Sequence, residues 1–124
     1  MDIGSDYPAL VGPKAGNIDI NLVFVQEKSA FPVYFFAAQV QDSLKEKFKN
    51  LIQISEDYLT TADGKDYFRW EVTDIQQGVT YYQVFYFFES GDWKLVITYT
   101  RPKGQGSQYD APVDDSMMTV RFTR

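Results

Sequence analysis

The chain has 124 residues with a net charge of -5, of which 44% are hydrophobic and 23% charged. This length suits one domain, and the composition excludes disordered and collagen-like chains. The acidic balance disfavours nucleic acids and anionic membrane surfaces as partners, because their phosphates need a concentrated basic patch. We therefore predict a single domain over residues 1–124 with no nucleic-acid partner.

Cysteine and histidine are both absent from the chain. Their absence removes disulfides, thiolate nucleophiles and any Ser-His-Asp arrangement, so we expect no catalytic residues, no metal site and no cofactor. No apolar run approaches the roughly 18 residues of a membrane-spanning helix, so we expect no membrane insertion. We expect an extracytoplasmic location if Met1 replaces a removed leader, and a cytoplasmic one otherwise.

Aromatic residues make up 17% of the chain, which favours β-sheet. Pro8 and Pro13, among several glycines, predict an irregular N-terminal arm over residues 1–16. Alternation from Ile18 to Val25 then predicts a first strand. After a turn, residues 31–39 predict a second strand that starts near Pro32.

One helix is predicted to begin at Ser43, because Ser43 and Glu46 have the spacing of a capping box. The apolar residues that follow fall on one helical stripe, which would pack on the sheet. The stripe consists of Leu44, Phe48, Leu51 and Ile52.

Alternating, aromatic-rich segments in the second half predict further strands separated by turns and by a loop over residues 102–112. The predicted strands cover residues 57–60, 67–73, 79–88, 93–100 and 118–123. The sequence thus predicts an α+β fold, with an antiparallel sheet of about six to seven strands and one main helix packed on it.

Three carboxylates lie close together near the C-terminus, at Asp110, Asp114 and Asp115. Carboxylate oxygens suit calcium, but the spacing differs from that of an EF-hand and its glycine is missing. Solvated loop carboxylates are therefore the favoured interpretation.

The chain resembles the PsbP-like superfamily, which includes bacterial envelope lipoproteins, a photosystem II extrinsic protein and a Ran-binding protein. The resemblance covers about residues 17–124 and rests on fold-level patterns. These are an early Tyr7-Pro8, a helix opening with Ser43-Leu44, the strand YFRWEVT, the hairpin YYQVFYFFESGDWKLVITYT, and a terminal strand with Ser116, Thr119 and Phe122.

This resemblance implies an antiparallel sheet with helices against it, and a non-enzymatic, partner-binding role. Such a role fits the soluble part of a bacterial envelope protein. Family members carry a helix before the last strand, where this chain has GQGSQYDAPVDDS. We expect at most a short helical turn after Asp110.

Two functions are considered. The first is a non-catalytic binding or accessory domain, whose partner is a protein or a second copy of the chain. The alternative is a small ligand-binding protein, or an enzyme that uses a carboxylate and tyrosines in an aromatic pocket. A deep, enclosed cavity lined by tyrosines with a buried carboxylate would favour the alternative.

A partner or ligand face follows from the predicted hairpin, whose tip at Ser90-Gly91 sets Phe88 opposite Trp93. The wholly apolar face of this hairpin is assigned to the helix from Ser43. The mixed face would be only partly covered, by the arm or the loop from Pro102 to Pro112, unless these seal it as ordinary core. Its residues are Tyr81, Gln83, Phe85, Phe87, Lys94 and Thr98.

Overall fold

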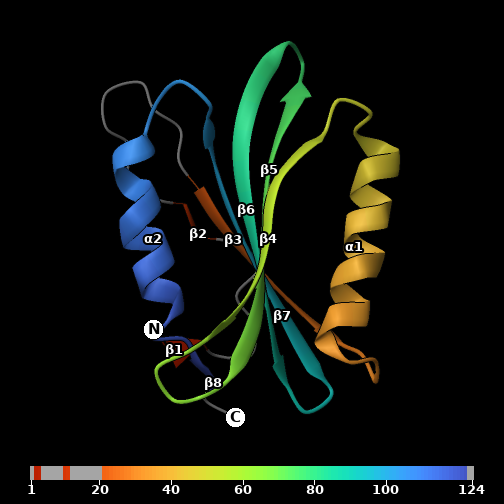
Figure 1. Cartoon of the computed structure of the whole chain (residues 1–124), viewed down its shortest axis with the longest axis vertical. Coiled ribbons are helices and arrows are strands. Elements are labelled where there is room, and N and C mark those ends of the chain that lie inside the picture. Colours follow the sequence, from red (N-terminus) through yellow and green to blue (C-terminus); the bar gives the residue numbers. More distant parts are fainter. Residues whose placement is uncertain (1, 4–9, 12–20, 123–124) are drawn as a thin grey trace.

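The computed structural model describes residues 2–3, 10–11 and 21–122 of the chain. Its architecture is α+β, and two helices lie on opposite sides of one antiparallel sheet (Figure 1). This confirms the predicted class. The helices are α1 (Val33–Lys47) and α2 (Asp110–Met117), the latter preceded by the single turn η1 (Ser107–Tyr109).

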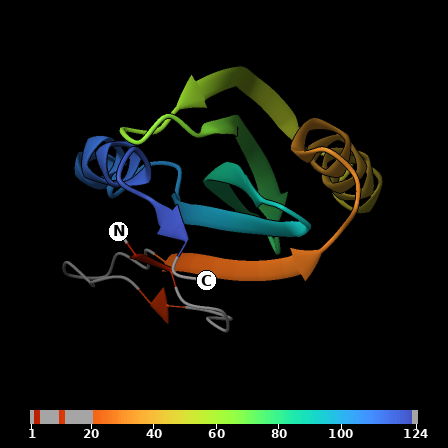
Figure 2. The same cartoon turned by 90° about the horizontal axis from the view of Figure 1, so that it is seen from below.

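The main sheet has the strand order β2-β3-β7-β6-β5-β4, and all of its pairs are antiparallel. A separate parallel pair joins β1 to β8. Figure 2 shows the strands between the two helices, with β4 and β3 toward the two edges of the layer. The strands are β1 (Asp2–Ile3), β2 (Leu10–Val11), β3 (Asn21–Lys28), β4 (Ile52–Thr60), β5 (Asp66–Gln76), β6 (Val79–Ser90), β7 (Trp93–Pro102) and β8 (Arg121–Phe122).

The prediction of six to seven strands in one sheet with one main helix is wrong for the part of the chain that the structure describes. Five strands, β3 to β7, make up most of the sheet, since β2 contributes two residues. The predicted last strand leaves this sheet, because β8 pairs with β1 instead. A second helix, α2, covers the face opposite α1.

The segment predicted as a strand over residues 31–39 is helical from Val33 onward and forms the first part of α1. The apolar side chains of this segment also have helical spacing and form one stripe along the helix. In a helix the whole stripe packs on the sheet, whereas in a strand some of these side chains would face water. The stripe consists of Val33, Phe36, Ala37, Val40 and Leu44. Pro32 occupies the N-cap position, just before the helix, where a missing amide costs nothing.

The helix predicted from Ser43 is therefore displaced by ten residues. Ser43 is an exposed residue inside α1, and α1 has no side-chain cap. The helix ends at Lys47, with Phe48 as its extended C-cap, and the chain enters β4 at Ile52. Leu44 and Leu51 still contact the core, whereas Ile52 is 64% exposed.

The predicted loop after Pro102 contains α2, which is longer than the single turn expected there. Asp110 is in its first turn, where a carboxylate is favoured by the positive end of the helix dipole. Pro112 is also in the first turn, where no intrahelical amide hydrogen bond is lost. Pro112, at the end of the predicted loop, is thus equally compatible with a helix start.

The hairpin of β6 and β7 turns one residue later than predicted. Ser90 pairs with Trp93, which places Phe88 opposite Leu95 rather than opposite Trp93. Gly91 has φ of 58°, a left-handed conformation that glycine adopts without strain. Because the pairing shifts by two residues, each side chain keeps its predicted face.

Two clusters of buried side chains form the core, one on each side of the sheet. The wholly apolar face of the hairpin, which includes Val84, Tyr86 and Ile97, packs with Met117 of α2. The mixed face packs with Phe36 and other residues of α1. The predicted helix assignment was wrong, because the long helix covers the mixed face.

The predicted arm lies mostly outside the described residues, apart from β1 and β2. The same is true of Ile18 and Ile20, which begin the first predicted strand. The described part of that strand is β3, which runs beyond the predicted end at Val25 to Lys28.

Candidate functional site

The face predicted to bind a partner or ligand lies beneath α1. Phe87 is fully buried and Phe85 is 7% exposed, and the Phe36 ring meets Phe87 edge-on. The expectation that this face would be covered only by the arm or the loop is therefore wrong. Lys94 is buried as well, and the remaining three residues, Tyr81, Gln83 and Thr98, are half-buried.

Lys94 uses its charge within the chain. Its Nζ donates to the carbonyl oxygens of Ser29, at 3.0 Å, and Gly91, at 3.1 Å. It also lies 3.2 Å from Oε1 of Glu89. This lysine therefore ties the β6–β7 turn to the residue that follows β3.

Beside α1 the mixed face opens into a groove of about 440 Å³, which we call the helix groove. Phe85 and Thr98 of the predicted face line it, together with Val96 and Phe36. Val25 of β3 stands at its wall and is 47% exposed. Two of the six predicted residues thus reach an open surface.

A second hollow, the end pocket, lies where the start of α1 meets the β4–β5 and β6–β7 turns. Its volume is about 480 Å³. Three tyrosines and two carboxylates line it: Tyr34, Tyr58, Tyr67, Asp66 and Glu89. The pocket is open to solvent and Asp66 is exposed, so it is not the enclosed cavity with a buried carboxylate that would favour an enzyme.

Aromatic side chains cluster on the outer side of α1, next to the end pocket. Phe31, Tyr34 and Phe35 are each about half exposed, at 53%, 52% and 53%. The rings of Tyr34 and Phe35 stack at 4.9 Å between centroids, and Phe31 lies 6.5 Å from Phe35. Tyr58, 65% exposed, shares the end pocket with Tyr34. We call these four residues the aromatic patch.

Sequence reasoning missed this patch because it assigned residues 31–39 to a strand. Tyr34 and Phe35 of α1 are exposed next to the buried Phe36, and Phe31 precedes the helix with its ring beside that of Phe35. The available signal was that this segment, taken as a helix, carries aromatic residues on its outer side as well as on its core-facing side.

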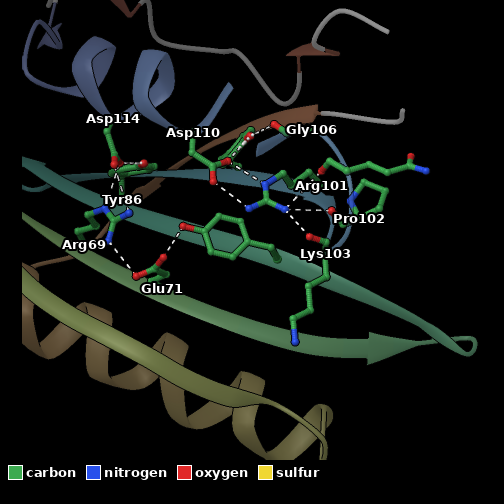
Figure 3. Close-up of polar contacts among 12 residues, drawn as sticks. Arg69, Glu71, Tyr86, Arg101, Pro102, Lys103, Gly106, Asp110 and Asp114 are labelled. Atoms are coloured by element: carbon green, nitrogen blue, oxygen red, sulfur yellow. Dashed lines mark hydrogen bonds and ion pairs between the residues drawn. The ribbon is translucent and has the colours of Figure 1, made fainter. Parts of the chain in front are cut away.

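On the other face, two ion pairs attach α2 to the sheet (Figure 3). Arg69 Nε donates to Oδ1 of Asp114 at 3.0 Å, and Arg69 Nη2 donates to Oδ2 at 3.3 Å. The hydroxyl of Tyr86 donates to the same carboxylate. Burial and this hydrogen bond to Asp114 raise the pKa of Tyr86. The tyrosine therefore stays protonated as a donor.

The second ion pair repeats this arrangement one helical turn earlier. Arg101 Nε and Nη2 each donate to the Asp110 carboxylate at 2.8 Å, and Tyr99 donates to Oδ1 at 2.7 Å. Arg101 also lies 4.2 Å from the ring centroid of Tyr82. Burial acts to raise the pKa of Asp110, but the Arg101 and Tyr99 hydrogen bonds outweigh it and lower that pKa.

Glu71 connects the two ion pairs. It accepts hydrogen bonds from Tyr82 and Ser55, and lies 3.4 Å from Arg69. Burial acts to raise the pKa of Glu71, while the hydrogen bonds from Tyr82 and Ser55 and the Arg69 charge bring it below the ordinary value. Asp110 and Glu71 are therefore held ionised by donors from the sheet.

The interpretation of Asp110 and Asp114 as solvated loop residues was wrong. They lie four residues apart on α2 and face the sheet, while Asp115 is exposed. The i, i+4 spacing of the two aspartates was a signal that the loop assignment hid. Across the described residues, no group of three or more carboxylates is arranged to hold a metal ion.

One buried carboxylate is not tied to a cation. Asp74 of β5 is 1% exposed; Gln76 donates to its Oδ2 at 3.2 Å, and its Oδ1 has no hydrogen-bond partner. Burial raises the pKa of Asp74, and the Gln76 hydrogen bond only partly opposes this. Asp74 does not line the end pocket or the helix groove.

Comparisons with known proteins give a fold and no family. No family model and no curated protein matches the chain. Among solved structures, the chain is similar to PA94 from Pseudomonas aeruginosa, a protein of unknown function, with a TM-score of 0.74 at 14% identity. The match covers 94% of this chain and 84% of the other. At this identity the likeness supports the fold alone.

Proposed function

We propose that the chain is a non-catalytic binding domain, and that its partner is a protein that sits on the aromatic patch and reaches into the end pocket. The observation that carries the proposal is the exposure of four neighbouring aromatic rings, which is 52% or more for each. Contiguous exposed apolar patches of this kind are uncommon on monomers and mark interaction sites. Tyr and Phe are also enriched in the cores of protein interfaces.

The non-catalytic part of the proposal is supported by the use of the charged groups. Asp110, Asp114 and Glu71 are engaged by arginines and tyrosines, and the contacts of the two aspartates position α2. A general base needs a free lone pair directed at a substrate. The oxygens of these three carboxylates accept hydrogen bonds from other residues of the fold instead.

The setting of the domain is also proposed. The resemblance to the PsbP-like superfamily favours the soluble part of a bacterial envelope protein. PA94, whose fold is similar, is described as a proposed regulator. Among the described residues no helix is long and apolar enough to cross a membrane.

The proposal is tested by capture from an extract of the source cells, with the wild-type chain, Phe35→Ser and Lys45→Ser as baits. Both changes are at exposed positions of α1, so both variants should melt within a few degrees of the wild type. We expect a protein that the wild type and Lys45→Ser retain and Phe35→Ser loses. Sedimentation velocity of the same proteins identifies a second copy as the partner. If Phe35→Ser retained every captured protein and the same oligomeric state, the proposal would be wrong.

A small ligand in the end pocket is a second candidate, favoured by Asp66 and Glu89 beside three tyrosines. Rings and carboxylates together suit a ligand that has an apolar face and hydrogen-bond donors. A fragment screen by NMR would support it if hits shifted the amides around Asp66 and lost affinity in Asp66→Asn. If the hits bound Asp66→Asn as tightly as the wild type, this second candidate would be wrong.

A further inference from the structure

The strand β4 presents a free edge. In the part of the chain that the structure describes, β4 is the last strand of the sheet and pairs only with β5. Eight of its nine residues are exposed, the exception being Ser55. Its outer amide and carbonyl groups therefore form a row that another strand could pair with.

This edge has only part of the usual protection against such pairing. Natural edge strands are usually blocked by lysine, by proline, by shortness or by a bulge. β4 is nine residues long, contains no lysine, arginine or proline, and has one irregularity, between Gln53 and Ser55. Three large apolar residues on it, Ile52, Ile54 and Tyr58, are more than half exposed.

The middle of the strand is acidic. Glu56 and Asp57 are exposed, and neither is in an ion pair among the described residues. Glu56 accepts a hydrogen bond from the neutral amide of Gln41, which leaves its charge uncompensated. An incoming strand would meet two adjacent negative charges at this point.

These charges select against a second copy of the same strand. If two β4 strands paired antiparallel about their centres, Glu56 would face either Glu56 or Asp57 of the other copy. Like charges directly opposite each other destabilise a pair of strands, whereas opposite charges stabilise it. The net charge of -5 also attracts basic segments and repels acidic ones.

From this geometry we infer that β4 accepts an extended, basic segment of a partner protein as an additional strand of the sheet. Main-chain hydrogen bonds would give affinity, and lysine or arginine opposite Glu56 on one face, or opposite Asp57 on the other, would give selectivity. The inference goes beyond the proposed function, because its site is the edge of β4 and it names the chemistry of the segment. The two sites share one residue, Tyr58.

The test uses a labelled octapeptide of alternating valine and lysine, with a valine–glutamate peptide and a proline-interrupted valine–lysine peptide as controls. We expect the valine–lysine peptide alone to bind and to shift the backbone amides of β4 in NMR spectra. Binding of either control peptide with similar affinity, no binding of any peptide, or shifts confined to other elements would overturn the inference.

A pair of matched variants isolates the charges. Glu56→Gln with Asp57→Asn removes two negative charges from β4 and should weaken the valine–lysine peptide about tenfold. Asp42→Asn with Glu46→Gln removes two charges from exposed positions of α1 and should change its affinity less than twofold. Equal weakening in both variants would mean that net charge alone attracts the peptide. If the peptide-binding tests failed while capture of a partner still depended on Phe35, the inference about β4 would be wrong and the proposed function would stand.

Discussion

The two faces of the sheet are covered by different physical means. On one side, the eight-residue α2 is held by two arginines that grip Asp110 and Asp114, with a tyrosine hydroxyl on each carboxylate. On the other side, the fifteen-residue α1 is held by ring packing, as of Phe36 against Phe87. A short helix buries little apolar area, so directional polar contacts compensate on its side.

This difference separates a fixed face from an adaptable one. Charge-assisted hydrogen bonds fix the position of α2 because their geometry is narrow. Apolar contacts tolerate small shifts of α1, and the helix groove and the end pocket both lie beside that helix. The aromatic patch is on the same side. We therefore propose that a partner binds on the side of α1 and that α2 gives structural support, and four measurements test this division.

The largest effect is expected from removing a ring beneath α1. Phe87 is fully buried, so Phe87→Ala should lower the free energy of unfolding by about 3 to 5 kcal/mol. Phe35→Ala removes an exposed ring on the outer side of α1 and should change the free energy of unfolding by less than about 0.5 kcal/mol. Urea melts at neutral pH measure both, and similar losses in the two variants would show that Phe35 is part of the core.

A smaller loss is expected from breaking an α2 ion pair. Arg101→Met leaves the Asp110 carboxylate without its cation and should cost about 3 kcal/mol. Replacing both partners, in Arg101→Met with Asp110→Leu, should recover part of this loss, because no charge is then stranded. Lys103→Met, at an exposed position, is the control in the same melts. A neutral Arg101→Met would mean that α2 does not depend on this pair.

The third prediction concerns pH. The pKa values of Asp110 and Glu71 are lowered in the folded chain, so their stabilising contribution is fully present above their unfolded values of about 3.9 and 4.3. It is lost as the pH falls through the lower, folded pKa values. Stability should therefore decrease from about pH 5 downward, and Arg101→Met should flatten this decrease. A wild-type curve that rises toward low pH would contradict the assignment.

The smallest effect is expected at Asp74, and it has the opposite sign. The pKa of Asp74 is raised in the folded chain, so this carboxyl does not lower the free energy of unfolding below its unfolded pKa. Its destabilising effect grows as the pH rises through the folded pKa. Asp74→Asn should stabilise the protein at pH 7 by on the order of 1 kcal/mol, and the gain should vanish in acid. A destabilised Asp74→Asn at pH 7 would point to a cation beside this carboxylate.

The sequence predicted the sheet better than the helices. Strands β5, β6 and β7 alternate in a pattern with period two. The predicted faces of the β6–β7 hairpin are correct because its pairing shifts by two residues, which keeps each side chain on its face. The segment from Val33 to Gln39 carries apolar residues nearly throughout, so both periods fit it and only the tertiary packing decides.

The site was harder to predict for a related reason. Phe85 and Phe87 were named because of their strand alternation, and burial under α1 removes most of their surface. The exposed rings are at Phe31, Tyr34 and Phe35, where an error in secondary structure also misplaced the side chains. Long-range partners such as Arg69 and Asp114 meet because α2 packs on the sheet beside β5, which no local pattern encodes.

The division of the two faces is tested most directly by site-specific photo-crosslinking in the source cells. A benzophenone side chain replaces either Ala38, exposed on α1, or Ala111, exposed on α2, so the two probes start from the same residue type. We predict a discrete adduct with a partner protein from position 38 and none from position 111. An adduct from position 111 alone, equal adducts from both positions, or no adduct from position 38 would contradict a binding face on the side of α1.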